Sequence, residues 1–486
     1  MNISLPHISR FILWSAIGFI CGVGVASFWH LQMESFLFVV SVFSVIIGII
    51  FYAQKWSWIM VTALLFCALG VMVVQKSVAR IAHMAHDAGA MREGAARIID
   101  DVRTKEWHSI VVAQFDDAVH TTVLIKDDKY SDLRRGDVIA LRCRTMVPEN
   151  YNQFDYRMYL AMKGIDYICA DVTYHVITHE DDFLTILARA RAYMENIVNS
   201  IIPAPQSALA NGLLFGGSDR LPSHLAQDFS LTGMTHIVAV SGYNVSIIVA
   251  TVIGALIFCG LYRKHAVVGA MIAVFLFVAL IGFPASGVRA AIMGTLVLVA
   301  AAYGRVTHAY GAIFTAAALM LIFNPLLLRY DVGFQLSFLA TLGIVAVYPL
   351  LEKYFVSKKT AFGIVDIILV TLSAQIFVLP IIAYHFQALS LLSLLANVLV
   401  LPIIPATMLF VFLMIVTSFL FLPAAFFFGW IAHFLLSYEI FVIQTLAEVP
   451  WNHIPVTHVS VFFFLVYYGL IGIVVFVLNK KHAYVY

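Results

Sequence analysis

Long apolar runs constrain this chain more than any other feature of its sequence. Three runs precede residue 75 and nine more follow residue 235, and most approach the roughly twenty apolar residues that a membrane-spanning helix needs. The 486 residues are 62% hydrophobic and 12% charged, whereas soluble domains are about half apolar and a quarter charged. The sequence therefore predicts a polytopic α-helical membrane protein and excludes a soluble globular one.

The apolar runs predict roughly twelve spans. The first run has no small-residue cleavage pattern, so we interpret it as a retained span rather than a signal peptide. Several runs are short or contain proline, which predicts broken helices at membrane depth. The expected spans are 11–30, 36–52, 58–74, 236–261, 266–283, 288–303, 309–323, 334–351, 362–382, 391–415, 419–442 and 458–478.

Residues 80–182 differ from the rest and contain 31 of the 56 charged residues. Short runs rich in Val, Ile and Thr, separated by polar turns, predict strands at 107–114, 120–125, 137–144 and 167–177. Strands at this spacing suggest a small β-barrel of the OB-like kind. Because this region has 13 basic and 18 acidic residues, its charge argues against strong, nonspecific phosphate binding.

The segment 183–202 has apolar residues on one helical face and charged residues elsewhere. It predicts either an amphipathic helix at the membrane surface or a helix that packs on the barrel. The expected organisation is an N-terminal three-helix membrane segment (1–79), an external barrel domain (80–182), interfacial helices (183–231) and a membrane channel domain (232–486).

Cationic segments predict the orientation. If the amino end is cytoplasmic, the segments 262–265, Arg305, 352–360 and Lys480–Lys481 all lie inside, as the positive-inside rule expects. The barrel then lies outside the cytoplasm, in an oxidising compartment. Cys143 and Cys169, on separate predicted strands, are therefore a plausible disulfide pair.

Polar residues interrupt the second membrane block at five places. The first is 232–250, TGMTHIVAVSGYNVSIIVA, and the others surround residues 286, 331, 375 and 397. Because polar groups at membrane depth must face protein or water, broken helices lining a cavity are expected. The candidate residues are His236, Ser241, Asn244, Arg289, Asp331, Gln335, Gln375 and Asn397.

Structural interpretations of the same residues remain open. Arg289 and Asp331 could form an ion pair between helix ends instead of belonging to a conduction path. The amides of Gln335, Gln375 and Asn397 could be hydrogen-bonding contacts between helices, and His385 fits a membrane interface. His236, Ser241 and Asp331 have the residue types of a hydrolytic triad, but no nucleophile elbow surrounds Ser241. No P-loop, HExxH motif or zinc-site spacing occurs, so no cofactor is predicted.

Several segments resemble, in order, those of the ComEC family of competence DNA-uptake channels. GLLFGGSDRLPSHLAQDFSLTGMTHIVAVSGYNVSIIVA from Gly212 resembles the family's glycine-rich lead-in and its HxxAxSG core. Later segments are similar as well: PASGVRAAIM from Pro284, NPLLLRYDVGFQLSFLATLGI from Asn324 and LPIIAYHFQALSLLSLLANVLVLP from Leu379. FDYRMYLAMKGIDYI from Phe154 resembles part of the family's external OB-like domain.

The resemblance implies a bacterial inner-membrane channel for single-stranded DNA during natural transformation, with the eight candidate residues along or supporting the path. It also implies an external DNA receptor and a cytoplasmic translocase or strand-binding protein as partners. Many members add a metallo-β-lactamase-like domain. This sequence has no HxHxDH pattern, so a non-enzymatic protein is expected, with a separate nuclease as a further partner. The alternatives are a membrane-embedded hydrolase, a small-solute or lipid transporter, and an assembly scaffold.

Overall fold

The computed structural model divides into two compact units, each described by itself. The barrel unit comprises Leu5–Ala190 and Phe314–Asp331, and the bundle unit comprises Met1–Ser4, Arg191–Ile313 and Val332–Tyr486. The structure describes residues 7–29, 55–86, 89–104, 107–117, 120–128, 132–151, 155–217, 221–238, 242–302, 309–355, 364–456 and 459–483.

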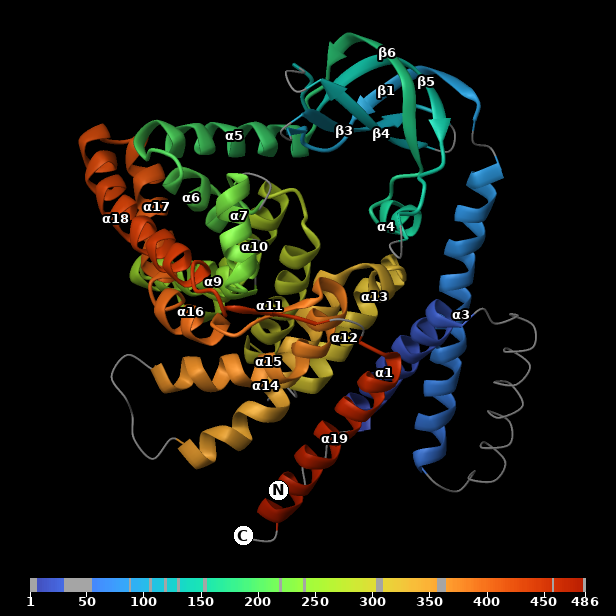
Figure 1. Cartoon of the computed structure of the whole chain (residues 1–486), viewed down its shortest axis with the longest axis vertical. Coiled ribbons are helices and arrows are strands. Elements are labelled where there is room, and N and C mark those ends of the chain that lie inside the picture. Colours follow the sequence, from blue (N-terminus) through green and yellow to red (C-terminus); the bar gives the residue numbers. More distant parts are fainter. Residues whose placement is uncertain are drawn as a thin grey trace. The chain divides into compact units, whose positions relative to one another are not determined.

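Five strands of the barrel unit close on themselves. The sheet order is β1-β5-β6-β4-β3, and an additional pairing of β1 with β3 completes the ring (Figure 1). Burial alternates along β3, as expected where one face of each strand lines a core. The predicted small barrel is confirmed as a closed five-stranded barrel, a form compatible with the OB type. The strands are β1 (Met91–Ile98), β2 (Arg103–Thr104), β3 (His108–Phe115), β4 (Thr122–Asp128), β5 (Asp137–Met146) and β6 (Tyr167–His179).

A disulfide joins Cys143 on β5 to Cys169 on β6, with their Cα atoms 5.5 Å apart. Both residues are buried in the barrel core. Register shifts interrupt the pairing of β5 with β6 between Arg142 and Arg144, so the bridge lies at an irregular part of this ladder. These are the two cysteines that the sequence predicts as a disulfide pair on separate strands.

The helices of the barrel unit pack through glycine. On α1 (His7–Phe28) and α3 (Lys55–His86), a Cβ atom on Gly22 or Gly70 would overlap the backbone of the facing helix, which is how small residues let membrane helices approach closely. Helix α3 continues six residues past Arg80, and the first strand, β1, begins at Met91. Two short helices, α4 (Tyr156–Met162) and α13 (Leu327–Tyr330), also belong to the unit, as do residues 314–323 of α12 (Ala309–Phe323).

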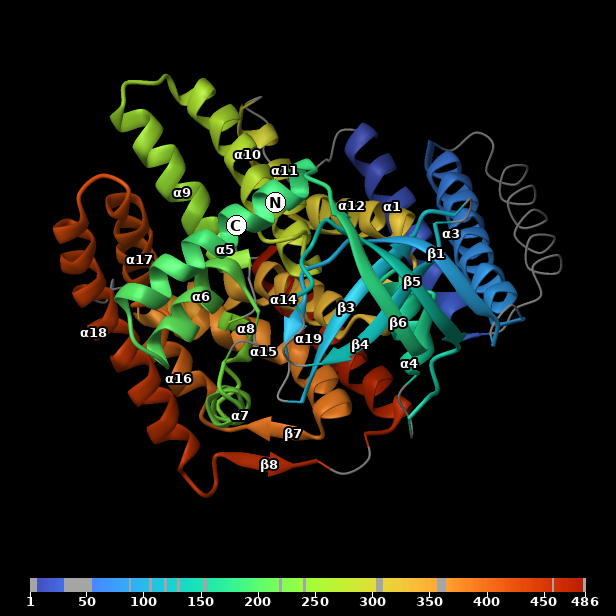
Figure 2. The ribbon, with the colours of Figure 1, turned by 90° about the horizontal axis from the view of Figure 1, so that it is seen from above.

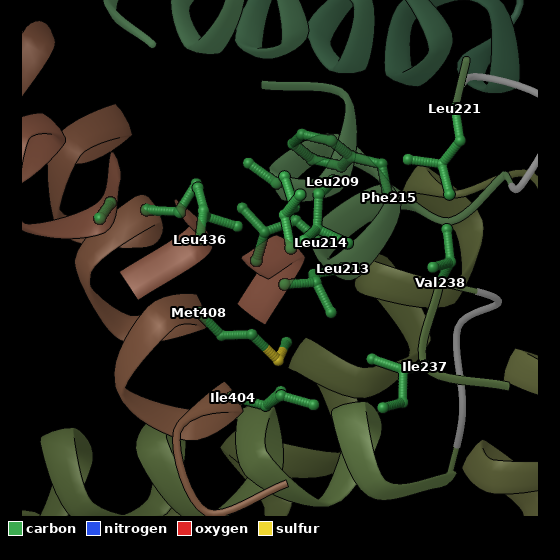
Figure 3. Packing of buried hydrophobic residues seen from close by; sticks show 14 of the residues in the cluster. Leu209, Leu213, Leu214, Phe215, Leu221, Ile237, Val238, Ile404, Met408 and Leu436 are labelled. Carbon is green, nitrogen blue, oxygen red and sulfur yellow. The ribbon is translucent and has the colours of Figure 1, made fainter. Parts of the chain in front are cut away.

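The bundle unit is built from helices around one apolar core, to which α6, α16, α17 and α18 contribute many residues (Figure 3). Helix α5 (Phe183–Ile201) spans both units: Thr185 packs against Gly136 of the barrel, and Val198 lies in the bundle core. The other helices of the bundle unit are α6 (Gln206–Phe215), α7 (Ser223–Leu231), α8 (Thr235–Val238), α9 (Gly242–Phe258), α10 (Arg263–Leu280), α11 (Ala285–Ala302), α14 (Val332–Phe355), α15 (Ile364–Phe386), α16 (Ser393–Val400), α17 (Ile404–Ser418), α18 (Leu422–Ala447) and α19 (Val461–Ala483).

Five of the described helices are long and apolar enough to cross a membrane. They lie at Phe11–Phe28, Ile59–Met84, Val332–Lys353, Ile364–Phe386 and Leu422–Ala447. Helices α16 and α17 pass the same test as a pair, but the chain bends by 47° between them. The chain is therefore a membrane protein with several candidate spans. The expected total of roughly twelve stays a prediction, and the expected span at 36–52 lies outside the described residues.

Candidate functional site

Polar side chains of the bundle unit gather around Asn452, beside a two-stranded hairpin. The hairpin pairs β7 (Ala388–Ser390) with β8 (His453–Pro455) in antiparallel register (Figure 2). Asn452 is fully buried. Its side-chain Nδ2 donates to the carbonyl of Leu231 at 3.0 Å, and its Oδ1 accepts from the amide of Leu392 at 3.3 Å. One side chain thus ties the end of α7 to the start of α16.

The hydrogen bonds continue from Asn452 to Gln375. The Ser390 hydroxyl donates to Asn452 Oδ1 at 3.2 Å, and the Ser393 hydroxyl donates to the Ser390 carbonyl at 3.1 Å. The Gln375 Nε2 donates to the Ser393 hydroxyl at 2.8 Å. Gln375 on α15 therefore contacts the first residue of α16, as expected of an amide that joins two helices.

His236 lies on the turn that packs against these serines. Gly233 precedes it with φ +70°, and a Cβ atom on Gly233 would lie 3.0 Å from the Cβ of Ser393. Nδ1 of His236 lies 3.1 Å from the carbonyl oxygen of Gly233, and the residue is exposed. Because this partner is a backbone carbonyl and not a carboxylate, the geometry adds no support to the hydrolytic triad.

Asn244 anchors the start of α9 inside the core. Its side chain is 1% exposed, and its Nδ2 donates to the carbonyl of Leu213 at 3.1 Å and to that of Ile237 at 3.4 Å. These bonds satisfy carbonyls near the ends of α6 and α8, which a helix terminus leaves without an internal donor. Ser241, three residues earlier, lies outside the described residues.

The remaining candidates are dispersed. The Oε1 atom of Gln335 on α14 lies 3.3 Å from the Nε2 atom of His385 on α15. The sequence did not predict this contact. Arg289 is buried on α11, with 5% of its surface exposed. It belongs to the bundle unit, whereas Asp331 belongs to the barrel unit, so their pairing stays a prediction.

Asn397 lies one turn before the bend between α16 and α17, and it is buried. Pro402 and Pro405 have no N–H, so they leave the carbonyls of Val398 and Leu401 without their helical donors. The Tyr243 hydroxyl donates to the Leu401 carbonyl at 3.3 Å, and the Tyr438 hydroxyl donates to that of Leu399 at 3.5 Å. The predicted broken helix is thus present, and tyrosines supply donors at its break.

Sequence analysis did not single out Asn452, Ser390 or Ser393. Asn452 follows Trp451 in a polar connection between apolar runs, where an asparagine normally indicates a turn. Its partner Leu231 is 221 residues away, so no local pattern could have revealed the contact. The candidate residue Gln375 and the prolines at 402 and 405 were the sequence signals that pointed to this part of the fold.

A cavity of about 220 Å³ lies within the barrel unit beside the end of α3. Arg80, Arg157 and Asp166 are among the residues that line it. Burial raises the pKa of Asp166, although the Thr122 amide and the guanidinium of Arg80 favour its ionised form. Within the described ranges, no cluster of His, Cys, Asp and Glu could hold a metal ion.

Comparisons with known proteins identify the family. The chain is 27% identical over 237 residues to ComE operon protein 3 of Bacillus subtilis (strain 168), an alignment that covers 49% of this chain and 30% of that protein. No solved structure matches the chain. The model of the Competence protein family matches residues 213–481, which is more than half of the sequence. The chain therefore belongs to the Competence protein family of ComEC-like membrane proteins.

Proposed function

We propose that the bundle unit conducts single-stranded DNA across the bacterial inner membrane during natural transformation. The observation that carries this proposal is the family match over residues 213–481. The matched stretch falls almost wholly in the bundle unit and contains every candidate residue, although Asp331 lies in the barrel unit. The matching family is described as Competence protein, which agrees with a role in DNA uptake.

The side chains of the bundle unit suit passage more than tight binding. Single-stranded DNA must carry its phosphates through the low-dielectric interior of the bilayer. This passage requires a water-filled path with hydrogen-bonding groups and few cations. The described candidates in this unit are amides, a histidine and one arginine. Asn244, Gln375 and Asn452 hold backbone segments in place, so their proposed role is to support the path. His236, which is exposed, is the residue we propose to meet the strand, and we propose that Arg289, which is buried, supports the path.

The proposed setting follows from the orientation argued from sequence. The barrel lies outside the cytoplasm, where a DNA receptor delivers the strand, and a cytoplasmic translocase or strand-binding protein pulls it inward. The chain itself acts as a channel in this proposal.

Uptake of fluorescent DNA by cells carrying His236→Ala or Arg289→Gln tests the proposal. We expect DNA to accumulate outside the inner membrane, with normal amounts of each variant in the membrane fraction. His175→Ala, which changes an exposed histidine on β6, is the matched control and should leave uptake unchanged. Normal uptake in both path variants would place the path elsewhere, and loss of the proteins from the membrane would show that the two residues act in folding.

A further inference from the structure

Glu439 is a carboxyl group buried in the apolar core of the bundle unit. It lies on α18 with 1% of its surface exposed, and its neighbour Thr407 on α17 is fully buried. Leu436 and Ile440 of α18 and Met408 of α17 belong to the same core, and Figure 3 shows Leu436 and Met408 extending into it. The proposed conduction of DNA uses no property of this carboxyl group.

No cation faces Glu439 from the helices that pack on α18. Helices α6, α16 and α17 contain no Asp, Glu, Lys, Arg or His. Helix α7 carries His224 and Asp228, but Asp228 faces Glu448, nine residues and about 13 Å along α18 at 1.5 Å per residue. Among the described residues, no Lys, Arg or His lies within ion-pair distance of Glu439.

Three more charged or titratable groups lie near this core, and all three are accounted for. Helix α5 approaches α18 where Ile201 meets Gly429, and its Arg191 and Glu195 pair with each other at 3.2 Å. His433 lies on α18 itself, six residues before Glu439 and about 9 Å away along the axis. An ionised Glu439 would therefore have no opposite charge beside it, and burial strongly disfavours an uncompensated carboxylate.

The hydrogen bonds of Thr407 agree with a neutral carboxylic acid. Its hydroxyl oxygen lies 2.6 Å from Oε1 of Glu439 and 3.3 Å from the carbonyl oxygen of Ile403, four residues earlier on α17. A hydroxyl has one proton, and a carbonyl can only accept. The hydroxyl can donate to either oxygen. When it donates to the Ile403 carbonyl, the 2.6 Å contact requires that Glu439 carry a proton and donate it to Thr407.

We propose that Glu439 and Thr407 form a proton-binding site in the interface of α17 and α18. The bound proton keeps the carboxyl group neutral and completes an interhelical hydrogen bond inside the core. Release of the proton leaves a carboxylate that must reach water, so it favours arrangements in which α17 and α18 separate. Protonation and the packing of these two helices are thus linked, because a ligand stabilises the state that binds it better.

Difference infrared spectroscopy on the purified full-length protein tests the site without DNA. We expect the spectrum of the unmodified protein minus that of Glu439→Gln to contain the C=O band of a protonated carboxyl group at neutral pH. The matched control is Glu448→Gln, which changes an exposed glutamate at the end of the same helix and should remove carboxylate bands instead. Carboxylate bands in the Glu439→Gln difference would overturn the proposal.

A second measurement remains informative if Glu439→Gln does not fold. Thr407→Val removes the acceptor while keeping the shape of the side chain, so the protonated C=O band should shift to higher frequency; an unchanged spectrum would refute the hydrogen bond. As pH rises from about 4, the ordinary pKa of a glutamate, to above neutrality, the Tm of the unmodified protein should fall by more than that of folded Glu439→Gln. Sodium-specific stabilisation at high pH, relative to choline, would identify a sodium site and overturn the assignment to a proton.

Discussion

Replacing Asn452 by alanine should destabilise the bundle unit by more than an ordinary polar substitution. The change removes the bond to the Leu231 carbonyl and the bond from the Leu392 amide, two backbone groups that the side chain satisfies in a fully buried position. Each buried group left without a partner costs about 1–3 kcal/mol. The Ser390 hydroxyl also loses its acceptor, but it can rotate toward another. We therefore expect a loss of about 2–6 kcal/mol in the free energy of unfolding.

The assay is unfolding of the purified full-length protein by increasing mole fractions of SDS in mixed micelles, followed by circular dichroism. Ser390→Ala is a graded control, because it removes only the hydroxyl that donates to Asn452 and should cost about 1 kcal/mol. A loss below about 1 kcal/mol for Asn452→Ala would refute the reasoning, since it would mean that water or a shifted backbone satisfies both groups.

Three further predictions follow from the packing and the charges. Gly343→Ala should destabilise by about 1–3 kcal/mol, because its Cβ would overlap the Ser373 carbonyl oxygen and approach Phe377 to 2.9 Å; Gly254→Ala, with open space around it, is the control and should lose no stability in the same unfolding assay. Nonreducing mass spectrometry of protein from native membranes should find the peptides of Cys143 and Cys169 linked, and their replacement by serine should lower stability by about 3–4 kcal/mol for a separation of 26 residues; two free thiols would contradict the bridge. Because burial raises the pKa of Asp166, its stabilising effect is greatest at low pH and is lost as pH rises through the pKa of the folded state, so thermal unfolding of Asp166→Asn should depend less on pH above about 4, the ordinary pKa of an aspartate.

Patterns that depend on neighbouring residues could be read from the sequence. The short Val- and Ile-rich runs predicted the barrel, and β3 at His108–Phe115 lies one residue from the expected strand at 107–114. The prolines at 402 and 405 predicted a broken helix, and the chain bends by 47° there. The alternation of apolar and polar residues, the helical spacing of apolar residues and the missing N–H groups of proline are local properties. They can therefore be recognised without knowledge of the tertiary fold.

Boundaries were less predictable where charge and secondary structure disagree. Arg80 is the first cation after the third apolar run, and the change in composition suggested that the soluble domain begins there. Helix α3 continues through this change in composition and ends at His86, because lysine and arginine have high helix propensity outside the apolar part of the helix. Composition locates the membrane surface, whereas the end of a helix depends on where its next contacts lie.

The site itself required the tertiary structure. Sequence analysis selected residues that are polar within apolar runs, and two of them, Asn244 and Gln375, proved to hold helix ends together. The residue with the most bonds, Asn452, was missed because it lies in a connection where polarity is ordinary. The free-energy cost of a polar side chain at membrane depth therefore helps to select candidate residues inside the spans. It does not help to find buried polar residues in the turns between the spans.

One contact bears on how many of the apolar runs cross the membrane. The ring of Tyr193 on α5 lies 5.8 Å from that of Phe419, in the turn between α17 and α18. Seven alternating crossings separate these residues in the twelve-span arrangement, and an odd number would place them on opposite faces of the bilayer. Residues in contact share a face, which requires an even number. The bent pair α16 and α17, with its two prolines and its tyrosine-capped carbonyls, is the segment best suited to enter the membrane and return on the same side.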